Sequence, residues 1–266
     1  MRSFICWLGG KSLLAGRIAA MIPSHQVYIE PFMGAAWTFF KKPQSPVEAL
    51  NDLNQNLVNL FRVVKDRFED FYGRRIFLLA CEREYKDFTA RLNHNGPWKD
   101  DVERALAFWY CLKQAFAGQI GRGWCFSRTR PPKSLEMEDL RAIHERLKRI
   151  YISDQDFEAC IKRWDGPRSF FYLDPPYMVT TRPEGRDYYQ CTMTVEDHAR
   201  LRAALGRIQG KFLLSYDDDP WVREAYQDFR ITEIETRYTV NNRPGQPRHR
   251  AVELLIKQLR ARAAGG

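Results

Sequence analysis

The fold of this chain is decided by the stretch SFFYLDPPY, residues 169–177. Residues 169–173 are almost all apolar, and a short apolar run bounded by polar and proline residues predicts a buried strand. Pro175 and Pro176 then fix φ, lack N–H donors and hold Asp174 out of the helical region. The chain therefore leaves the strand in a stiff, extended turn, at the edge where open α/β sheets bind their ligands.

This turn presents a carboxylate, free carbonyl oxygens and a phenol ring to one small space. The Asp174 carboxylate and the Pro175 carbonyl can accept hydrogen bonds from an amino group, and the ring of Tyr177 can stack on a flat base. Together these groups suit a base that carries an amine. Taken alone, the four residues are equally consistent with a strand that ends in a proline turn.

Composition narrows the class of protein. The chain has 266 residues, of which 44% are hydrophobic, and its 17 Phe, 12 Tyr and 7 Trp indicate a packed globule. Lys and Arg number 42 against 33 Asp and Glu, so the formal net charge is +9. This balance favours a polyanionic partner such as nucleic acid, although a basic charge also occurs in proteins without one.

Cysteine and histidine usage points away from disulfides and metals. The six cysteines are scattered, without a C-x-x-C pair or a preceding secretory segment, which is typical of reduced thiols in a cytoplasmic protein. The five histidines lack metal-ligand spacing, so we expect no metal site. The longest apolar stretches fall short of the ~20 residues that a membrane span needs, so we expect no membrane contact.

The N-terminal part of the chain alternates between strand and helix patterns. Residues 26–30 predict a strand, residues 31–36 a turn of small residues that opens a helix, and residues 47–51 a second strand. A helix follows from Asn54. Strand, turn, helix and strand in this order indicate the start of a parallel α/β sheet.

Residues 66–165 have a different character. They are helical and heavily charged, without a convincing strand except around residues 123–126, and predict an inserted subdomain. The sheet pattern then resumes, and residues 229–237 and 251–257 predict a terminal β-hairpin. The predicted domains are a sheet domain of residues 1–65 and 166–266 and an insertion of residues 66–165.

Five further residues have helical surroundings. Phe108, Trp109 and Tyr110 follow a helical pattern and are expected in the core. His144 and His198 lie in charged helical stretches and are expected to be solvated.

A second motif is EPFMGAA at residues 30–36. Its small residues let a ligand approach the backbone, and the following helix N-terminus adds a favourable partial charge. It is not G-x-G-x-x-G, so it does not predict a pyrophosphate site. Asp52 ends the next strand, where nucleoside-binding folds place a carboxylate for ribose hydroxyls. The pair indicates a nucleoside ligand, with a tight helix entry and a solvated Asp52 as the alternative.

A third motif is the N-terminal Trp7-x-Gly9-Gly10-Lys11. Glycines allow close backbone approach, and a lysine can pair with a ligand carboxylate. Alone, the segment is equally typical of a helix start with an exposed lysine.

In this order the motifs resemble those of the Dam-like adenine-N6 DNA methyltransferases. That family has a W-x-G-G-K segment, an E-P-F-x-G-x-G/A turn, an acidic D-x-N, an inserted recognition domain and then D-P-P-Y. The resemblance covers essentially the whole chain, including closing strands at residues 213–216 and 252–256, and is weakest inside 66–165. One departure is Ala36, where many relatives have glycine; the change is tolerable if φ is negative there.

The resemblance implies an α/β, Rossmann-like sheet of the S-adenosylmethionine-dependent methyltransferases, with a C-terminal β-hairpin and an inserted, mainly helical target-recognition subdomain. It implies methyl transfer from S-adenosylmethionine to an adenine flipped out of double-stranded DNA. Asp174 and the Pro175 carbonyl would accept hydrogen bonds from the amine, and Tyr177 would stack on the base. Lys11 would lie near the donor's carboxylate, and Asp52 would hold its ribose. The implied catalytic residues are Asp174, Pro175, Pro176 and Tyr177, and the implied cofactor-binding residues are Trp7, Gly10, Lys11, Glu30, Pro31, Phe32, Gly34, Asp52, Asn54 and Asp174.

Two basic segments are candidates for DNA contact. Residues 118–133 combine glycines with arginines, and arginine bound to guanine is the commonest specific base contact. Residues 237–250 are the second candidate, and for each segment a solvated positive face is the alternative. The candidate DNA-binding residues are Gln119, Arg122, Arg128, Arg130, Lys133, Asn242, Arg243 and Arg248.

Two alternative functions stay open beside adenine methylation. One is methylation of another amine, either the cytosine N4 of DNA or a protein glutamine; relatives of that kind tend to have Ser or Asn where Asp174 stands. The other is a catalytically silent DNA-binding module, which would have no reason to retain Lys11, Asp52, Asp174 and Tyr177 together. We expect a monomer of bacterial, phage or prophage type, and a cognate restriction endonuclease acting separately is left open as a partner.

Overall fold

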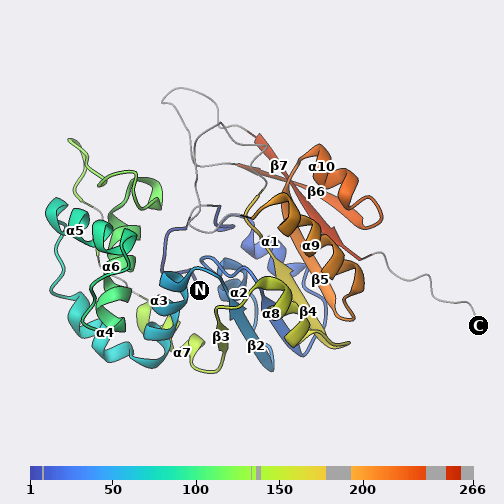
Figure 1. Cartoon of the computed structure of the whole chain (residues 1–266), viewed down its shortest axis with the longest axis horizontal. Helices are drawn as coiled ribbons and strands as arrows, with labels where there is room; N and C mark the ends of the chain where they lie inside the picture. The colour runs from blue at the N-terminus through green and yellow to red at the C-terminus, as the bar shows by residue number, and fades with distance from the viewer. Residues whose placement is uncertain (8, 133, 136–138, 178–192, 238–249, 259–266) are drawn as a thin grey trace, which may run out of the picture.

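The computed structural model describes residues 1–7, 9–132, 134–135, 139–177, 193–237 and 250–258. Within these residues the strands form one seven-stranded sheet in the order β3-β2-β1-β4-β5-β7-β6 (Figure 1). The first five strands along the chain pair with one another in parallel, whereas β7 runs antiparallel to β5 and to β6. The strands are β1 (Val27–Glu30), β2 (Val47–Asn51), β3 (Tyr151–Ser153), β4 (Ser169–Leu173), β5 (Lys211–Asp217), β6 (Arg230–Arg237) and β7 (Arg250–Lys257). The predicted α/β sheet and its terminal hairpin are confirmed.

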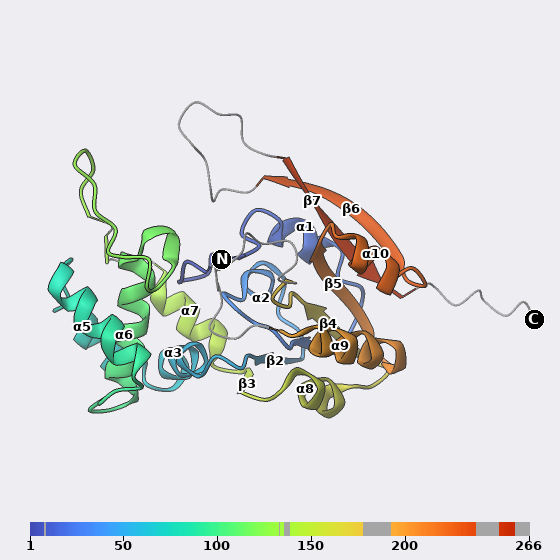
Figure 2. The ribbon, with the colours of Figure 1, turned by 45° about the horizontal axis from the view of Figure 1, so that its top comes forward.

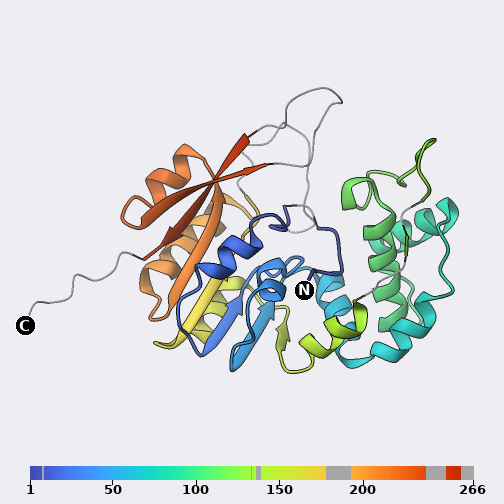
Figure 3. The same ribbon diagram turned by 180° about the vertical axis from the view of Figure 1, so that it is seen from behind.

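Helices cover both faces of the sheet, which explains the apolar run of β4. Phe170 and Tyr172 pack in the core on the face of α1, α2 and α3, whereas Phe171 and Leu173 pack under α8, α9 and α10. A parallel strand buried on both sides has no polar face, so its sequence shows no alternation. Figure 3 shows α1 and α2 on the near face of the sheet. The helices of these layers are α1 (Ala15–Ala20), α2 (Trp37–Lys41), α3 (Gln55–Asp66), α8 (Phe157–Trp164), α9 (Val195–Arg207) and α10 (Pro220–Ala225).

The direction of the strand order changes between β1 and β4. From β1 the chain moves outward through β2 to β3, and from β4 it moves the other way to β5. At such a switch point the loops that follow two adjacent parallel strands diverge and leave a crevice at their carboxyl ends. The EPFMGAA turn of residues 30–36 follows β1 and the DPPY motif of residues 174–177 follows β4, so both flank this crevice.

A separate helical lobe lies beside β3 and α3 (Figures 1 and 2). Its longest helix, α6, is almost entirely buried, because it packs against both α3 and α5. Phe108, Trp109 and Tyr110 of α6 are buried, which confirms the prediction that they belong to the core. The helices of the lobe are α4 (Phe68–Arg75), α5 (Glu82–Asn93), α6 (Asp101–Gln114), the short η1 (Phe116–Gly118) and α7 (Leu140–Leu147).

Two expectations about strands inside residues 66–165 are wrong. The block contains β3, which pairs with β2 as the edge of the described sheet, and α8, which covers that sheet. β3 has only three residues, and Tyr151 is 61% exposed, so the sequence shows no apolar run there. Residues 123–126, in contrast, form no strand in the structure; Trp124 makes an isolated bridge with Ala115.

The two histidines predicted to be solvated are also placed differently. His198 on α9 is fully buried, with its Nδ1 hydrogen-bonded to the hydroxyl of Tyr216 on β5. His144 on α7 is half-buried, and its Nδ1 lies 2.9 Å from the carbonyl oxygen of Val64. In both helices the imidazole faces the neighbouring element, although exposed charged residues such as Glu145 and Glu196 lie close to it in the sequence. No helix in the described part of the chain is long and apolar enough to cross a membrane.

Candidate active site

A pocket of about 1090 Å³, including its open mouth, lies at the switch point. Its walls come from the N-terminal loop, the EPFMGAA turn, the end of β2, the start of α8 and the DPPY motif. All the predicted catalytic and cofactor-binding residues line it: Trp7, Gly10, Lys11, Glu30, Pro31, Phe32, Gly34, Asp52, Asn54, Asp174, Pro175, Pro176 and Tyr177.

Asp174 is held at the pocket wall through one of its two carboxylate oxygens. The hydroxyl of Ser215 on β5 donates to Oδ1 over 3.0 Å, and the ammonium of Lys11 lies 2.8 Å from the same oxygen. In this ion pair the Asp174 side chain is 20% exposed and the Lys11 side chain only 5%, so Asp174 is the partner that is more accessible from the pocket. Among the described residues both contacts are to Oδ1, and Oδ2 is therefore the oxygen that can accept a hydrogen bond from a ligand.

Lys11 is buried and lies among the groups of the DPPY motif. Its ammonium contacts Asp174, is hydrogen-bonded to the Tyr177 hydroxyl and lies 4.6 Å from the centre of the Tyr177 ring. A third partner is the carboxylate of Glu253 on β7, whose Oε1 is 3.5 Å from Lys11 Nζ. Lys11 was expected near a ligand carboxylate; the structure pairs it with carboxylates of the chain itself. It therefore joins the N-terminal loop to the DPPY motif.

The EPFMGAA turn is fixed by hydrogen bonds to Asp52. The Gly34 N–H donates to Asp52 Oδ2 over 3.0 Å, and the Asn54 N–H donates to Oδ1 over 2.9 Å. Burial raises the pKa of the Asp52 carboxyl group, while these two backbone donors oppose the shift. Asn54 itself caps α3, because its side chain accepts hydrogen bonds from the N–H groups of Asn56 and Leu57. The carboxylate expected to bind a ribose thus also shapes the turn.

Two backbone positions in this turn have positive φ. Gly34 has φ of +44°, and a Cβ there would lie 3.1 Å from the Trp7 indole, so a side chain would be strained and would crowd the indole. Ala36 has φ of 51°, so the condition under which alanine would be tolerated without strain at this position, a negative φ, is not met. In this left-handed region a Cβ costs roughly 1–2 kcal/mol, so the chain tolerates backbone strain at Ala36.

Glu30 lines the pocket at the end of β1 and is 1% exposed. The hydroxyl of Tyr28 donates to its Oε1 over 2.6 Å. Burial raises the pKa of Glu30 to about 8, although the hydrogen bond from Tyr28 and the charge of Lys42 oppose the shift. At neutral pH this residue is therefore mainly a neutral hydrogen-bonding group.

Comparison with known proteins agrees with this geometry. Residues 7–240 match the family described as D12 class N6 adenine-specific DNA methyltransferase. The chain belongs to this family. It is 30% identical to a type II methyltransferase of Lactococcus lactis subsp. cremoris over 96% of this chain and 95% of the relative. It is 27% identical to the DNA adenine methylase of Escherichia coli, over 96% and 94% of the two chains, and 25% identical to a type II methyltransferase of Methanocaldococcus jannaschii, over 96% and 98%.

The family assignment decides among the alternative functions. The protein is an adenine-specific DNA methyltransferase, so DNA is its substrate. Methylation of cytosine N4 or of a protein glutamine, and a silent DNA-binding module, are therefore not supported.

Sequence reasoning missed Glu253, although it lies in this methyltransferase's site. Glu253 is 3% exposed, and its Oε1 lies 3.4 Å from the Tyr177 hydroxyl, which donates to it. Burial raises the pKa of Glu253 to about 7; Asp174 and Asp217 add to the shift, and Lys11 opposes it. The signal in the sequence is a single charged residue inside the otherwise apolar strand Val252–Ile256. A charged residue is almost never fully buried unless it has a partner, so this position predicts a buried contact.

The predicted DNA-binding residues are distributed unevenly. Arg122, Arg128 and Arg130 are exposed on the segment between η1 and α7, which projects from the helical lobe in Figure 2. Gln119 is instead 7% exposed, and both polar atoms of its amide lack a hydrogen-bond partner among the residues that the structure describes. Phe126, which the sequence reasoning did not select, is 68% exposed beside these arginines. Lys133, Asn242, Arg243 and Arg248 lie outside the described residues.

Proposed function

We propose that this methyltransferase transfers a methyl group from S-adenosylmethionine to N6 of an adenine that has been flipped out of double-stranded DNA into the pocket. The observation that carries the proposal is the shared pocket: the EPFMGAA turn and the DPPY motif face one space at the switch point. One motif suits an adenosyl ligand and the other suits an amine on a flat ring. A base in a duplex cannot reach such a recess, so it must leave the stack.

The chemistry of the pocket walls fits the donor. Acidic side chains outnumber basic ones among the described lining residues, where Lys11 is the cation and Asp174 and Glu253 already face it. S-Adenosylmethionine supplies a methyl group on a positively charged sulfur, and such a cation is favoured beside carboxylates. We propose that Asp52 accepts hydrogen bonds from the ribose hydroxyls. The other acidic lining residues are Asp156, Asp174 and Asp197; Glu30 also lines the pocket but is mainly protonated at neutral pH.

The DPPY motif is proposed to prepare the amine. The lone pair of the adenine amine is delocalised into the ring, which makes the nitrogen a poor nucleophile. Asp174 Oδ2 and the Pro175 carbonyl would accept its two hydrogens and favour a tetrahedral nitrogen, and so free the lone pair for attack. Tyr177 would stack on the base, a contact worth about 1–3 kcal/mol. Placement of two reactants in line contributes most of the rate in such a site.

The helical lobe is proposed to be the target-recognition part. It carries the exposed arginines of the projecting segment, and none of its described residues lines the pocket. Because β3 and α8 belong to the sheet layer, we place the insertion between α3 and β3, with α3 shared by both parts. The charge of this segment suits the phosphates of duplex DNA.

A labelled-methyl assay tests the proposal. The protein is incubated with tritiated S-adenosylmethionine and mixed-sequence duplex DNA, and the hydrolysed nucleosides are separated. We expect label in N6-methyladenine, a loss of about 100-fold or more in kcat for Asp174→Ala, and donor binding by equilibrium dialysis retained. Asp154→Ala is the matched control, because Asp154 is an exposed carboxylate that also directly follows a strand of the sheet. Label in another nucleoside, or near-native turnover of the Asp174 variant, would refute the proposal.

A further inference from the structure

We propose that Glu253 is a positioning residue of the methyl-transfer site: it holds the Lys11 ammonium and the Tyr177 hydroxyl, and so keeps the charge of Asp174 directed at the target amine. The inference deepens the proposed function and rests on it. Glu253 lies on β7, the antiparallel strand inserted next to β5, far from DPPY in the sequence. Its carboxylate nevertheless reaches the motif.

The geometry shows one carboxylate oxygen that serves two partners. Glu253 Oε1 lies 3.5 Å from Lys11 Nζ and 3.4 Å from the Tyr177 hydroxyl. Lys11 in turn lies 2.8 Å from Asp174 Oδ1. Removal of the Glu253 charge would leave the buried ammonium compensated by Asp174 alone. Because a buried charge is costly without a partner, Lys11 would then hold the Asp174 carboxylate more strongly, and less of that charge would be available to the substrate amine.

The charge of the cluster explains why a second carboxylate helps the reaction. With Glu253 ionised, Lys11, Asp174 and Glu253 together carry one negative charge; with Glu253 protonated they are neutral. As the nitrogen–methyl bond forms and the sulfur–methyl bond breaks, positive charge passes to the amine nitrogen, which then releases one proton to solvent. A cluster with a net negative charge stabilises that nitrogen better than a neutral one.

The titration of Glu253 makes the idea measurable. The charged and titratable groups that face it are Lys11, Asp174, Tyr177, Asp217 and Tyr172. Burial, together with Asp174 and Asp217, places the pKa of Glu253 at about 7 despite Lys11. Activity should therefore fall as the pH is lowered through about 7, because Glu253 then becomes neutral.

The decisive experiment is the pH profile of single-turnover methylation, with saturating DNA and S-adenosylmethionine, for the native protein and Glu253→Gln. In the variant we expect the fall in rate near pH 7, the acidic limb of the profile, to disappear. The rate at high pH should be about 10- to 100-fold lower than in the native protein, because a unit charge close to the reacting nitrogen is lost. Binding of the donor should change little. Glu235→Gln is the matched control: Glu235 is an exposed carboxylate on β6, opposite Val252, and its removal should leave the limb in place.

A second variant tests the idea without touching the cluster. Asp217 pairs with Glu253 in the sheet register and raises its pKa, so Asp217→Asn should move the limb to lower pH while the plateau rate is kept. A limb that persists near pH 7 in Glu253→Gln, or that does not move in Asp217→Asn, overturns the role of Glu253. If the native protein forms no N6-methyladenine at any pH, the proposed function fails instead.

Discussion

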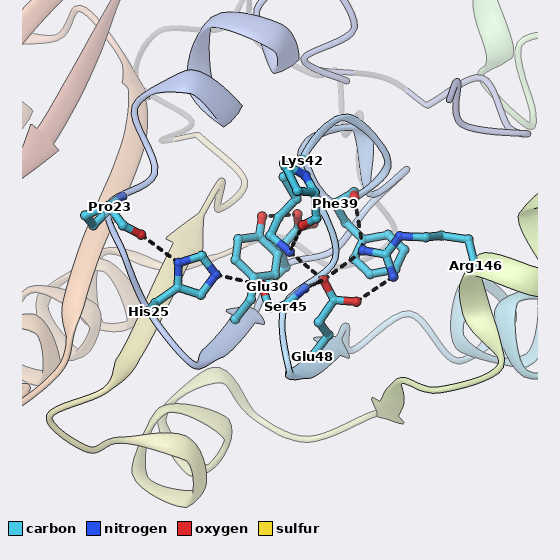
Figure 4. Close-up of polar contacts among 10 residues, drawn as sticks. Pro23, His25, Glu30, Phe39, Lys42, Ser45, Glu48 and Arg146 are labelled. Atoms are coloured by element: carbon cyan, nitrogen blue, oxygen red, sulfur yellow. Dashed lines mark hydrogen bonds and ion pairs between the residues drawn. The ribbon is translucent and has the colours of Figure 1, made fainter.

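Glu30 carries a carboxyl group that stays protonated near neutral pH because it is buried; Figure 4 shows it close to Lys42. Its pKa of about 8 in the folded protein lies above the ordinary value of 4.5. Between these two values the folded chain binds a proton that the unfolded chain has released. The contribution of Glu30 to the free energy of unfolding is therefore greatest below about pH 4.5 and falls as the pH rises toward 8.

The variant Glu30→Gln tests this linkage, because the amide keeps the shape and neutrality of the protonated acid. We expect the free energy of unfolding of the native protein to fall between pH 5 and 8. In the variant the slope of this fall should be smaller by up to about 1.4 kcal/mol per pH unit. Urea denaturation at a series of pH values measures it, with Glu235→Gln as an exposed control. Glu253 should account for part of the slope that remains, and equal slopes in native and Glu30→Gln proteins would contradict the assignment.

The motif residues could be predicted from the sequence because each carries its chemistry locally. Asp174 and Tyr177 lie directly after an apolar strand, so their place at the sheet edge follows from the order of the residues. Glu253 could not be assigned in this way, since its partners come from both ends of the chain. The positive φ of Ala36 was missed because alanine, unlike glycine, gives no sign of a left-handed backbone.

At the scale of elements, helix α7 is joined to the sheet by a buried charge network (Figure 4). Arg146 of α7 forms two hydrogen bonds with the carboxylate of Glu48 on β2, which also pairs with Lys42. Burial opposes ionisation of Glu48, but the hydrogen bonds from Arg146 and Lys42 outweigh it and lower its pKa. Nearby, His25 joins two loops, with Nε2 lying 2.7 Å from the hydroxyl of Ser45.

Loss of Arg146 should destabilise the fold strongly, because Glu48 is 1% exposed and would keep a buried charge with one partner fewer. We expect Arg146→Ala to lower the free energy of unfolding by about 3–5 kcal/mol. Arg141→Ala on the same helix is the control: its ion pair with Glu69 is exposed, and such pairs are worth about 0–1 kcal/mol. Chemical denaturation of both variants decides the matter, and similar losses would show that the network does not anchor α7.

The elements themselves were predictable where hydrophobic pattern and length agreed. β2 and β4 were bounded correctly, since both are buried runs flanked by polar or proline residues. β3 was missed because a three-residue edge strand has almost no pattern and owes its place to pairing with β2. The helices of the lobe were recognised only as a block, because their packing against α3 is not a local property of the sequence.

At the scale of the whole molecule, the net charge of +9 favours DNA binding only if basic residues are exposed on the surface that faces the duplex. Many arginines are instead engaged in surface ion pairs, such as Arg200 with Asp156 and Arg202 with Asp228. Arg128 and Arg130 are exposed on the projecting segment beside the aromatic ring of Phe126. This segment, rather than the average charge of the surface, should therefore determine how strongly the duplex is bound.

Salt dependence distinguishes this placement from a merely solvated basic face. A phosphate contact made by one arginine contributes about one unit to the slope of log affinity against log salt, because counterions are released on binding. The double variant Arg128→Ala, Arg130→Ala should thus lower that slope by about 2 and weaken binding more at low salt than at high salt. Arg207→Ala on α9, an exposed arginine away from the lobe, should leave the slope unchanged. Fluorescence anisotropy with a duplex oligonucleotide over a salt series measures the slopes. If the double variant and the Arg207 control behave alike, the projecting segment does not contact phosphates and the duplex must approach the pocket over another surface.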